Sequence, residues 1–153
     1  MPAIGHVHLK VSDLDRAIAF YGLLGLSVQA RYGAEAAFLS WGGYHHHLGL
    51  NTWRSKGAAP APEHHPGLFH AAFLFEDRPA LARAVRAVTA AGHPLAGASD
   101  HGVSEAVYLS DPDGNGVELC RDRPRAEWPR CPDGSLAMTT EPLDLAALLA
   151  EGG

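Results

Sequence analysis

Two histidines and one glutamate have the residue types and spacing of a metal site. His6 opens an alternating apolar segment, His70 opens a similar segment 64 residues later, and Glu118 lies between Val117 and Leu119. On extended strands such alternation turns the polar side chains away from the face that buries the apolar ones. Two imidazoles and one carboxylate on a shared concave face form a 2-His-1-carboxylate site, which is typical of non-haem Fe(II) oxygenases.

Each of these three residues has a plainer interpretation when taken alone, as a satisfied or solvated side chain on a strand. Their agreement in strand phase and repeat position favours the metal. A bare, inward-facing Glu118 would also be costly to bury, and a metal ion would remove that cost.

The segment 44–53 and the residues around Tyr108 supply further candidates. Alternation places His45, His47, Gly49 and Asn51 on one face, and His46, Leu48 and Leu50 on the other. We therefore expect His47 and His45 to face the site, with Gly49 leaving room for a ligand against the backbone. A solvated, polar strand end is the alternative for this segment.

Tyr108 is expected to turn inward because Val107 and Leu109 form the apolar pair beside it. His101 lies just upstream, with Gly102, in a predicted loop at the mouth of the cavity. Cys120 shares the predicted face of Glu118, where an inert, buried thiol is the simpler interpretation.

The elements that must position these residues form an internal repeat. A strand around 5–11 and a strand around 70–75 each run into an amphipathic helical stripe. Ser12 and Asp15 predict a capping box for the first helix, and Pro79 suits the first turn of the second. Three strand-like runs follow each helix, at 26–31, 36–41 and 45–52, and at 94–96, 106–110 and 117–121.

The predicted fold class is therefore α+β, with two pseudo-symmetric βαβββ modules forming a concave metal-binding sheet cavity. We expect one domain over 1–153, with module one at about 4–53, a linker at 54–66 and module two at 67–122. The C-terminal arm, residues 123–153, carries a short helical run around 143–149. A single open α+β sheet is the alternative.

Composition excludes several classes of function. The net charge is −5, with 12 basic and 17 acidic residues, which argues against a nucleic-acid footprint. No apolar stretch approaches the ~20 residues of a membrane helix, and the start has no signal-peptide core. The two cysteines, Cys120 and Cys131, fit a reducing compartment, so a cytoplasmic location is expected. No GxSxG, phosphate-binding loop or CxxC motif occurs.

GHVHLKVSDLDRAIAFY together with DPDGNGVEL resembles the vicinal-oxygen-chelate superfamily, over about residues 4–122. This superfamily includes glyoxalase I, fosfomycin and bleomycin resistance proteins, and extradiol dioxygenases. The resemblance implies paired βαβββ modules, with His6 rather than His8, His70 and Glu118 as metal ligands.

HHHLGLNTW, HGVSEAVYLSDPDGNGVEL and the tail RAEWPRCPDGSLAMTTEPLDL are similar to the catechol-2,3-dioxygenase-like, single-domain branch. This resemblance implies Fe(II)-dependent extradiol cleavage of a catechol-type diol with O2, a reaction of aromatic catabolism, by a homodimer. His47 would be the acid/base residue, with His45 the second choice. His101 would bind substrate, and Tyr108 would bind a substrate oxygen and help ring opening.

Two rival functions stay open at this point. The first is a glyoxalase-like isomerase, lyase or thiol transferase that uses Zn(II), Ni(II) or Mn(II) without O2. Such enzymes usually take a fourth ligand, Glu or Gln, late in the first module, where this chain has His45 and His47 instead. The second rival is a metal-free binding protein, which the retention of all three ligands disfavours.

Overall fold

The computed structural model describes all 153 residues, which form two compact units. The first unit contains Met1–Gly67 and Asp111–Asn115, and the second contains Leu68–Ser110 and Gly116–Gly153. Each unit carries a βαβββ motif built on a mixed sheet, which confirms the α+β class and the two modules predicted from the repeat. No helix is both long enough and apolar enough to cross a membrane.

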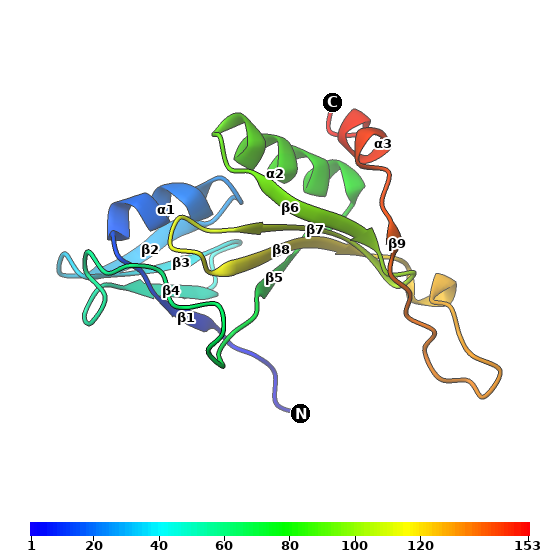
Figure 1. Cartoon of the computed structure of the whole chain (residues 1–153), viewed down its shortest axis with the longest axis horizontal. Coiled ribbons are helices and arrows are strands. Elements are labelled where there is room, and N and C mark those ends of the chain that lie inside the picture. The colour runs from blue at the N-terminus through cyan, green and yellow to red at the C-terminus, as the bar shows by residue number, and fades with distance from the viewer. The chain divides into compact units, whose positions relative to one another are not determined.

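The sheet of the first unit has the order β1-β4-β3-β2 (Figure 1). β1 is parallel to β4, whereas β3 is antiparallel to both β4 and β2. Its elements are β1 (Val7–Lys10), α1 (Leu14–Gly22), β2 (Ser27–Tyr32), β3 (Ala36–Ser40) and β4 (Leu48–Asn51).

Helix α1 packs on one face of this sheet because its apolar stripe matches the apolar phase of β1. Leu9 and Val11 are buried, together with Ala17, Phe20 and Tyr21 of the helix. The polar residues of β1 therefore lie on the opposite, open face of the sheet.

The predicted capping box of α1 is wrong. Asp13, not Ser12, caps the helix, and its carboxylate accepts from the backbone N–H of Arg16. Ser12 instead donates to Asp113, at 2.5 Å from the hydroxyl and 3.1 Å from the backbone nitrogen. The turn at 110–116 makes a further contact with α1, because Asp111 accepts a 2.9 Å hydrogen bond from the buried Tyr21 hydroxyl.

The sheet of the second unit has the order β5-β8-β7-β6-β9, with β5 parallel to β8 and the other pairs antiparallel. Its elements are β5 (Ala71–Leu74), α2 (Arg78–Ala90), β6 (Leu95–Asp100), β7 (Ser104–Ser110), β8 (Gly116–Asp122), a 3-10 turn (Arg125–Glu127), β9 (Glu141–Pro142) and α3 (Leu145–Ala150). β6 is longer than the predicted strand 94–96, because it pairs with β7 from Leu95 to Asp100, and β9 pairs with its far end.

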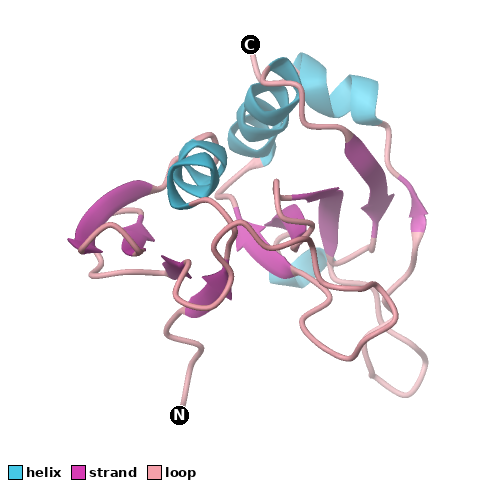
Figure 2. Ribbon diagram, turned by 60° about the vertical axis from the view of Figure 1, so that its left-hand side comes forward, coloured by secondary structure: helices cyan, strands magenta, loops and turns pink.

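The C-terminal arm is built into this second unit. β9 extends the sheet, and α3 packs beside α2, where Leu148 is fully buried (Figure 2). Asp144 caps α3 by accepting from the Ala147 N–H, and Arg86 of α2 donates to the Leu149 carbonyl. The helical run predicted around 143–149 is therefore confirmed, and the arm contributes both a strand and core packing.

Candidate functional site

His70 and Glu118 lie together in the second unit, where parallel strands bring them side by side. Glu118 sits opposite Ala72 in the β5–β8 ladder, and His70 immediately precedes β5. The His70 Nε2 atom is 2.8 Å from Glu118 Oε2, and the two side chains are 31% and 12% exposed. Val117 and Leu119 are buried on the other face, as predicted. The His70 imidazole therefore gives the Glu118 carboxylate a partner within the second unit, and the metal-ligand role of both residues stays a prediction.

Tyr108 lies next to this pair, directly opposite Glu118 in the β7–β8 ladder. Its ring centroid is 5.8 Å from that of His70. Burial, and then the negative charge of Glu118, raise the pKa of the Tyr108 hydroxyl above its ordinary value. Val107 and Leu109 are buried, so the predicted inward orientation of Tyr108 is confirmed.

His101 completes a line of contacts within the second unit. It lies in the connection between β6 and β7, as predicted, and its Nε2 atom is 2.7 Å from the Tyr108 hydroxyl oxygen. The second unit thus brings together His70, Glu118, Tyr108 and His101.

In the first unit, His6 has a neighbour that the alternation argument did not predict. The His46 ring lies 4.3 Å from the His6 ring and 5.0 Å from the Phe38 ring, measured between centroids. Burial, and then neighbouring imidazoles led by His6, lower the pKa of His46. The prediction that His46 shares a face with Leu48 and Leu50 is wrong.

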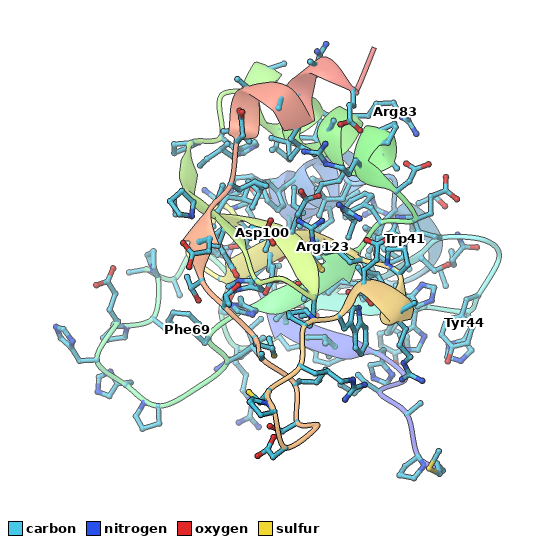
Figure 3. All side chains as sticks on the ribbon, turned by 90° about the vertical axis from the view of Figure 1, so that its right-hand side faces the viewer. Trp41, Tyr44, Phe69, Arg83, Asp100 and Arg123 are labelled. Carbon is cyan, nitrogen blue, oxygen red and sulfur yellow. The ribbon has the colours of Figure 1, made fainter.

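The reason is that β4 begins only at Leu48. Residues 41–47 form a turn, in which the Tyr44 N–H donates to the Trp41 carbonyl, so the period of two does not extend back through the histidines. His47 lies against Trp41 and Tyr44, with ring centroids 5.2 and 4.6 Å away, and Figure 3 labels these two aromatic residues. His45 stacks on Tyr44 at 4.1 Å and is exposed. The acid/base role of His47 or His45 stays a prediction.

His8 is the residue that sequence reasoning passed over. Its ring lies over Gly49, its partner in the β1–β4 ladder, where a Cβ at position 49 would meet the His8 ring at 2.8 Å. The His8 ring also contacts Phe38 and Trp53, and its Nε2 atom is 3.0 Å from Asn51 Nδ2. Burial, and then His6, lower its pKa. The predicted space for a ligand at Gly49 is therefore filled by His8. The sequence signal that could have predicted this contact is a histidine and a glycine that alternation places on the same face of two neighbouring strands.

The donor set fits the metal that the resemblance implies. The proposed donors are two imidazoles and a carboxylate, with no thiolate among them. Such a set suits Fe(II), and also Mn(II), Zn(II) or Ni(II). His70 and Glu118 belong to the second unit and His6 to the first. Within neither unit do three His, Cys, Asp or Glu side chains gather closely enough to hold a metal ion.

Two βαβββ units on mixed sheets, with imidazole and carboxylate side chains on the strands, define a two-module α+β fold. Comparison with known families identifies the superfamily that has this fold. The model of the Glyoxalase/Bleomycin resistance protein/Dioxygenase superfamily matches residues 3–119, and the chain belongs to this superfamily.

Individual relatives lie on both the dioxygenase and the glyoxalase side of the superfamily. A catechol-2,3-dioxygenase of Bacillus subtilis (strain 168) is 38% identical over 156 residues, covering 98% of this chain and 52% of that protein. The chain thus spans about half the length of this relative. A lactoylglutathione lyase from Agrobacterium tumefaciens is 27% identical, with a TM-score of 0.59 over 78% of this chain and 92% of that one. A superfamily domain from Frankia sp. EAN1pec, at 22% identity and a TM-score of 0.66 over 80% of this chain and 99% of that one, has the same fold.

Proposed function

We propose that this chain is an Fe(II)-dependent extradiol dioxygenase, which cleaves the ring of a catechol-type diol beside its two hydroxyls with O2. The observation that carries the proposal is the line of contacts from Glu118 through His70 and Tyr108 to His101 in the second unit. The similarity to a catechol-2,3-dioxygenase over almost the whole chain supports the same reaction class.

His6, His70 and Glu118 are the residues proposed to hold the metal. Fe(II), when bound, would supply open coordination positions and Lewis acidity toward the diol oxygens. A homodimer, a cytoplasmic location and a role in aromatic catabolism belong to the same proposal.

The chain's own residues would orient the diol and manage its protons. Tyr108 lies next to both His70 and Glu118, so its hydroxyl is placed to hydrogen-bond a diol oxygen. His101, 2.7 Å from that hydroxyl, holds the tyrosine in place. A positioned acid or base contributes about 10²–10⁴-fold to a rate.

The ring contacts favour His46 over His47 as the acid/base residue of the site. The His46 imidazole neighbours His6, the proposed ligand of the first unit, whereas His47 packs on Trp41 and Tyr44.

An O2-independent, glyoxalase-like isomerase is the second candidate, which the similarity to a lactoylglutathione lyase favours. The register argues against it. Gly49 faces His8 in the β1–β4 ladder as Glu118 faces Ala72 in the β5–β8 ladder. The first-module position equivalent to Glu118 therefore carries no side chain, and a fourth ligand there is absent.

The test is O2 consumption with catechol after the protein is loaded with Fe(II) under anaerobic conditions, with an absorbance scan for a yellow semialdehyde. We expect His70→Ala and Glu118→Ala to lose both bound iron and O2 uptake. His64→Ala and Glu127→Ala, which change exposed residues of the same types, should retain both. Uptake that persists in Glu118→Ala would refute the ligand assignment.

The acid/base role is tested by comparing His46→Gln with His47→Gln. We expect His46→Gln to keep its iron and to lose roughly 10²-fold or more in kcat, as removal of a positioned acid or base does. His47→Gln should stay close to the parent, and the reverse order would return the role to His47. Stoichiometric iron without uptake from any diol would favour the O2-independent candidate.

A further inference from the structure

The C-terminal arm reaches back to the segment that carries His101. The backbone N–H of Thr139 donates to the His101 carbonyl, at 3.1 Å. β9 then pairs with the end of β6, so that Glu141 lies opposite Asp100. A Cβ at Gly102, whose φ is +75°, would meet Pro129 Cγ at 2.9 Å. The arm therefore packs closely against the residues on both sides of His101.

Asp100 fixes the same segment from the other direction. Its carboxylate accepts from the Gly102 N–H at 2.8 Å and pairs with Arg123 at 2.5 Å. Figure 3 labels Asp100 and Arg123, whose side chains lie together at the end of the sheet of the second unit. The backbone that carries His101 is thus held by Asp100 of β6 and by the arm, to which Arg123 belongs.

The two nitrogens of the His101 ring have different partners, and these partners fix its tautomer. Nδ1 is 2.8 Å from the Thr139 carbonyl oxygen, which can only accept, so Nδ1 carries the proton. In the neutral imidazole Nε2 is then unprotonated, and it accepts from the Tyr108 hydroxyl at 2.7 Å. The Thr140 hydroxyl, at 3.4 Å from Nδ1, is compatible with the same tautomer.

We propose that the C-terminal arm is a working part of the site, in which the Thr139 carbonyl holds His101 as the Nδ1–H tautomer, so that Nε2 can take the proton of Tyr108. This inference rests on the proposed dioxygenase function. Thr139 acts as a positioning residue, because its carbonyl acts through the His101 ring. His101 and Tyr108 carry the proton.

The proton transfer balances without any other reactant. A diol hydroxyl gives its proton to the Tyr108 oxygen as the Tyr108 proton passes to His101 Nε2. One O–H bond of the diol breaks, one N–H bond forms on His101, and no electrons change hands. The Thr139 carbonyl then stabilises the imidazolium, since a hydrogen bond from a charged donor is stronger than one from a neutral donor. The other tautomer would present an N–H to the Tyr108 oxygen and could take no proton from it.

The first experiment determines the tautomer directly, without any assay of activity. Long-range ¹H–¹⁵N spectra would be recorded on the full chain with ¹⁵N-labelled histidine, free and with Zn(II) as a diamagnetic metal, and His101→Gln would assign the signals. We expect a protonated Nδ1 and a pyridine-like Nε2 for His101. Tyr108→Phe should shift the Nε2 signal but leave the tautomer unchanged. A protonated Nε2 in the neutral ring would overturn the inference.

The second experiment weakens the Thr139 carbonyl alone. Cys131 allows the segment 131–153 to be joined as a synthetic peptide, in which an ester replaces the amide between Thr139 and Thr140. An ester carbonyl is a poorer acceptor, and the all-amide chain made by the same ligation is the matched control. We expect kcat to fall about tenfold with KM nearly unchanged, together with a smaller share of the Nδ1–H tautomer.

The outcomes separate this inference from the proposed function. If the all-amide chain consumes O2 and the ester changes neither kcat nor the tautomer, the role of the arm is refuted and the dioxygenase stands. If the all-amide chain consumes no O2 with any diol, the dioxygenase and the proton transfer both fail. The NMR spectra then still decide whether Thr139 sets the tautomer.

Discussion

Replacing Gly49 with alanine tests the contact between the His8 ring and position 49 on the open face of the first sheet. A Cβ at position 49 would lie 2.8 Å from both Cγ and Nδ1 of His8 and 3.0 Å from Cδ2. These atoms lie near the root of the imidazole, so the whole ring must swing away from β4. Gly49→Ala therefore displaces His8 from Asn51, Phe38 and Trp53.

The cost follows from the contacts that the ring would lose. Overpacking typically costs about 1–3 kcal/mol, and a lost hydrogen bond costs about 1 kcal/mol more. A total of about 2–4 kcal/mol corresponds to a fall in Tm of roughly 5–15 °C for a protein of this size. Urea unfolding and thermal melts followed by circular dichroism would measure both quantities.

The decisive control is the same substitution in a His8→Ala background. Without the ring, the three atoms nearest to the added methyl group are gone, and alanine in a strand interior is favoured over glycine by about 0.5–1 kcal/mol. The effect of Gly49→Ala should therefore change sign between the two backgrounds. An equal loss in both backgrounds would show that the His8 ring does not occupy this position and would refute the reasoning.

Three further outcomes are expected. Glu105→Gln should lower the free energy of unfolding by about 3 kcal/mol, because the buried carboxylate pairs with Arg78 at 2.9 Å and with Arg121 at 2.6 Å. The control Asp15→Asn breaks an exposed ion pair and should hardly change a urea titration. Tyr21→Phe should cost about 1.5–3 kcal/mol, since it leaves the buried Asp111 carboxylate without its hydroxyl donor, and a thermal melt equal to that of the parent would contradict this. In the native protein iodoacetamide should label Cys131 well before Cys120, whose burial raises the pKa of its thiol to about 12; peptide mapping reads the order, and equal rates would argue against the burial.

The direction of a side chain was predicted best where a strand is extended and only one of its faces is buried. The phases of Val7, Val117 and Tyr108 follow from alternation alone, because one face of each strand packs on a helix and the other cannot. Alternation failed for the segment 41–47 because a turn precedes the strand. The direction in which the His46 side chain points is set by that turn. A pattern with a period of two carries no information where the backbone is not extended.

The contacts between distant segments were beyond sequence reasoning for a different reason. The Thr139 carbonyl meets His101 across 38 residues of sequence, and the His8 ring covers Gly49 from the neighbouring strand. A carbonyl acceptor has no residue type, so the role of the arm has no signature in the sequence. The grouping of His70, Tyr108 and Glu118 was predictable, because all three follow from strand phase and the DPDGNG turn.

The two modules share one backbone plan, but the large side chain of the parallel strand pair lies on the first strand in one module and on the last strand in the other. In the β5–β8 ladder Glu118 stands over the small Ala72, whereas in the β1–β4 ladder His8 stands over Gly49. A Cβ at position 49 would lie 2.8 Å from the His8 ring, so the His8 ring in this position excludes a ligand such as glutamate at position 49. The first module can then offer the imidazole of His6 but no second carboxylate, and the proposed donor set stops at two histidines and one glutamate. A set of three ligands leaves more open positions for a diol and O2 than a set of four. The exchange between His8 and Gly49 therefore favours an oxygenase over a four-ligand isomerase.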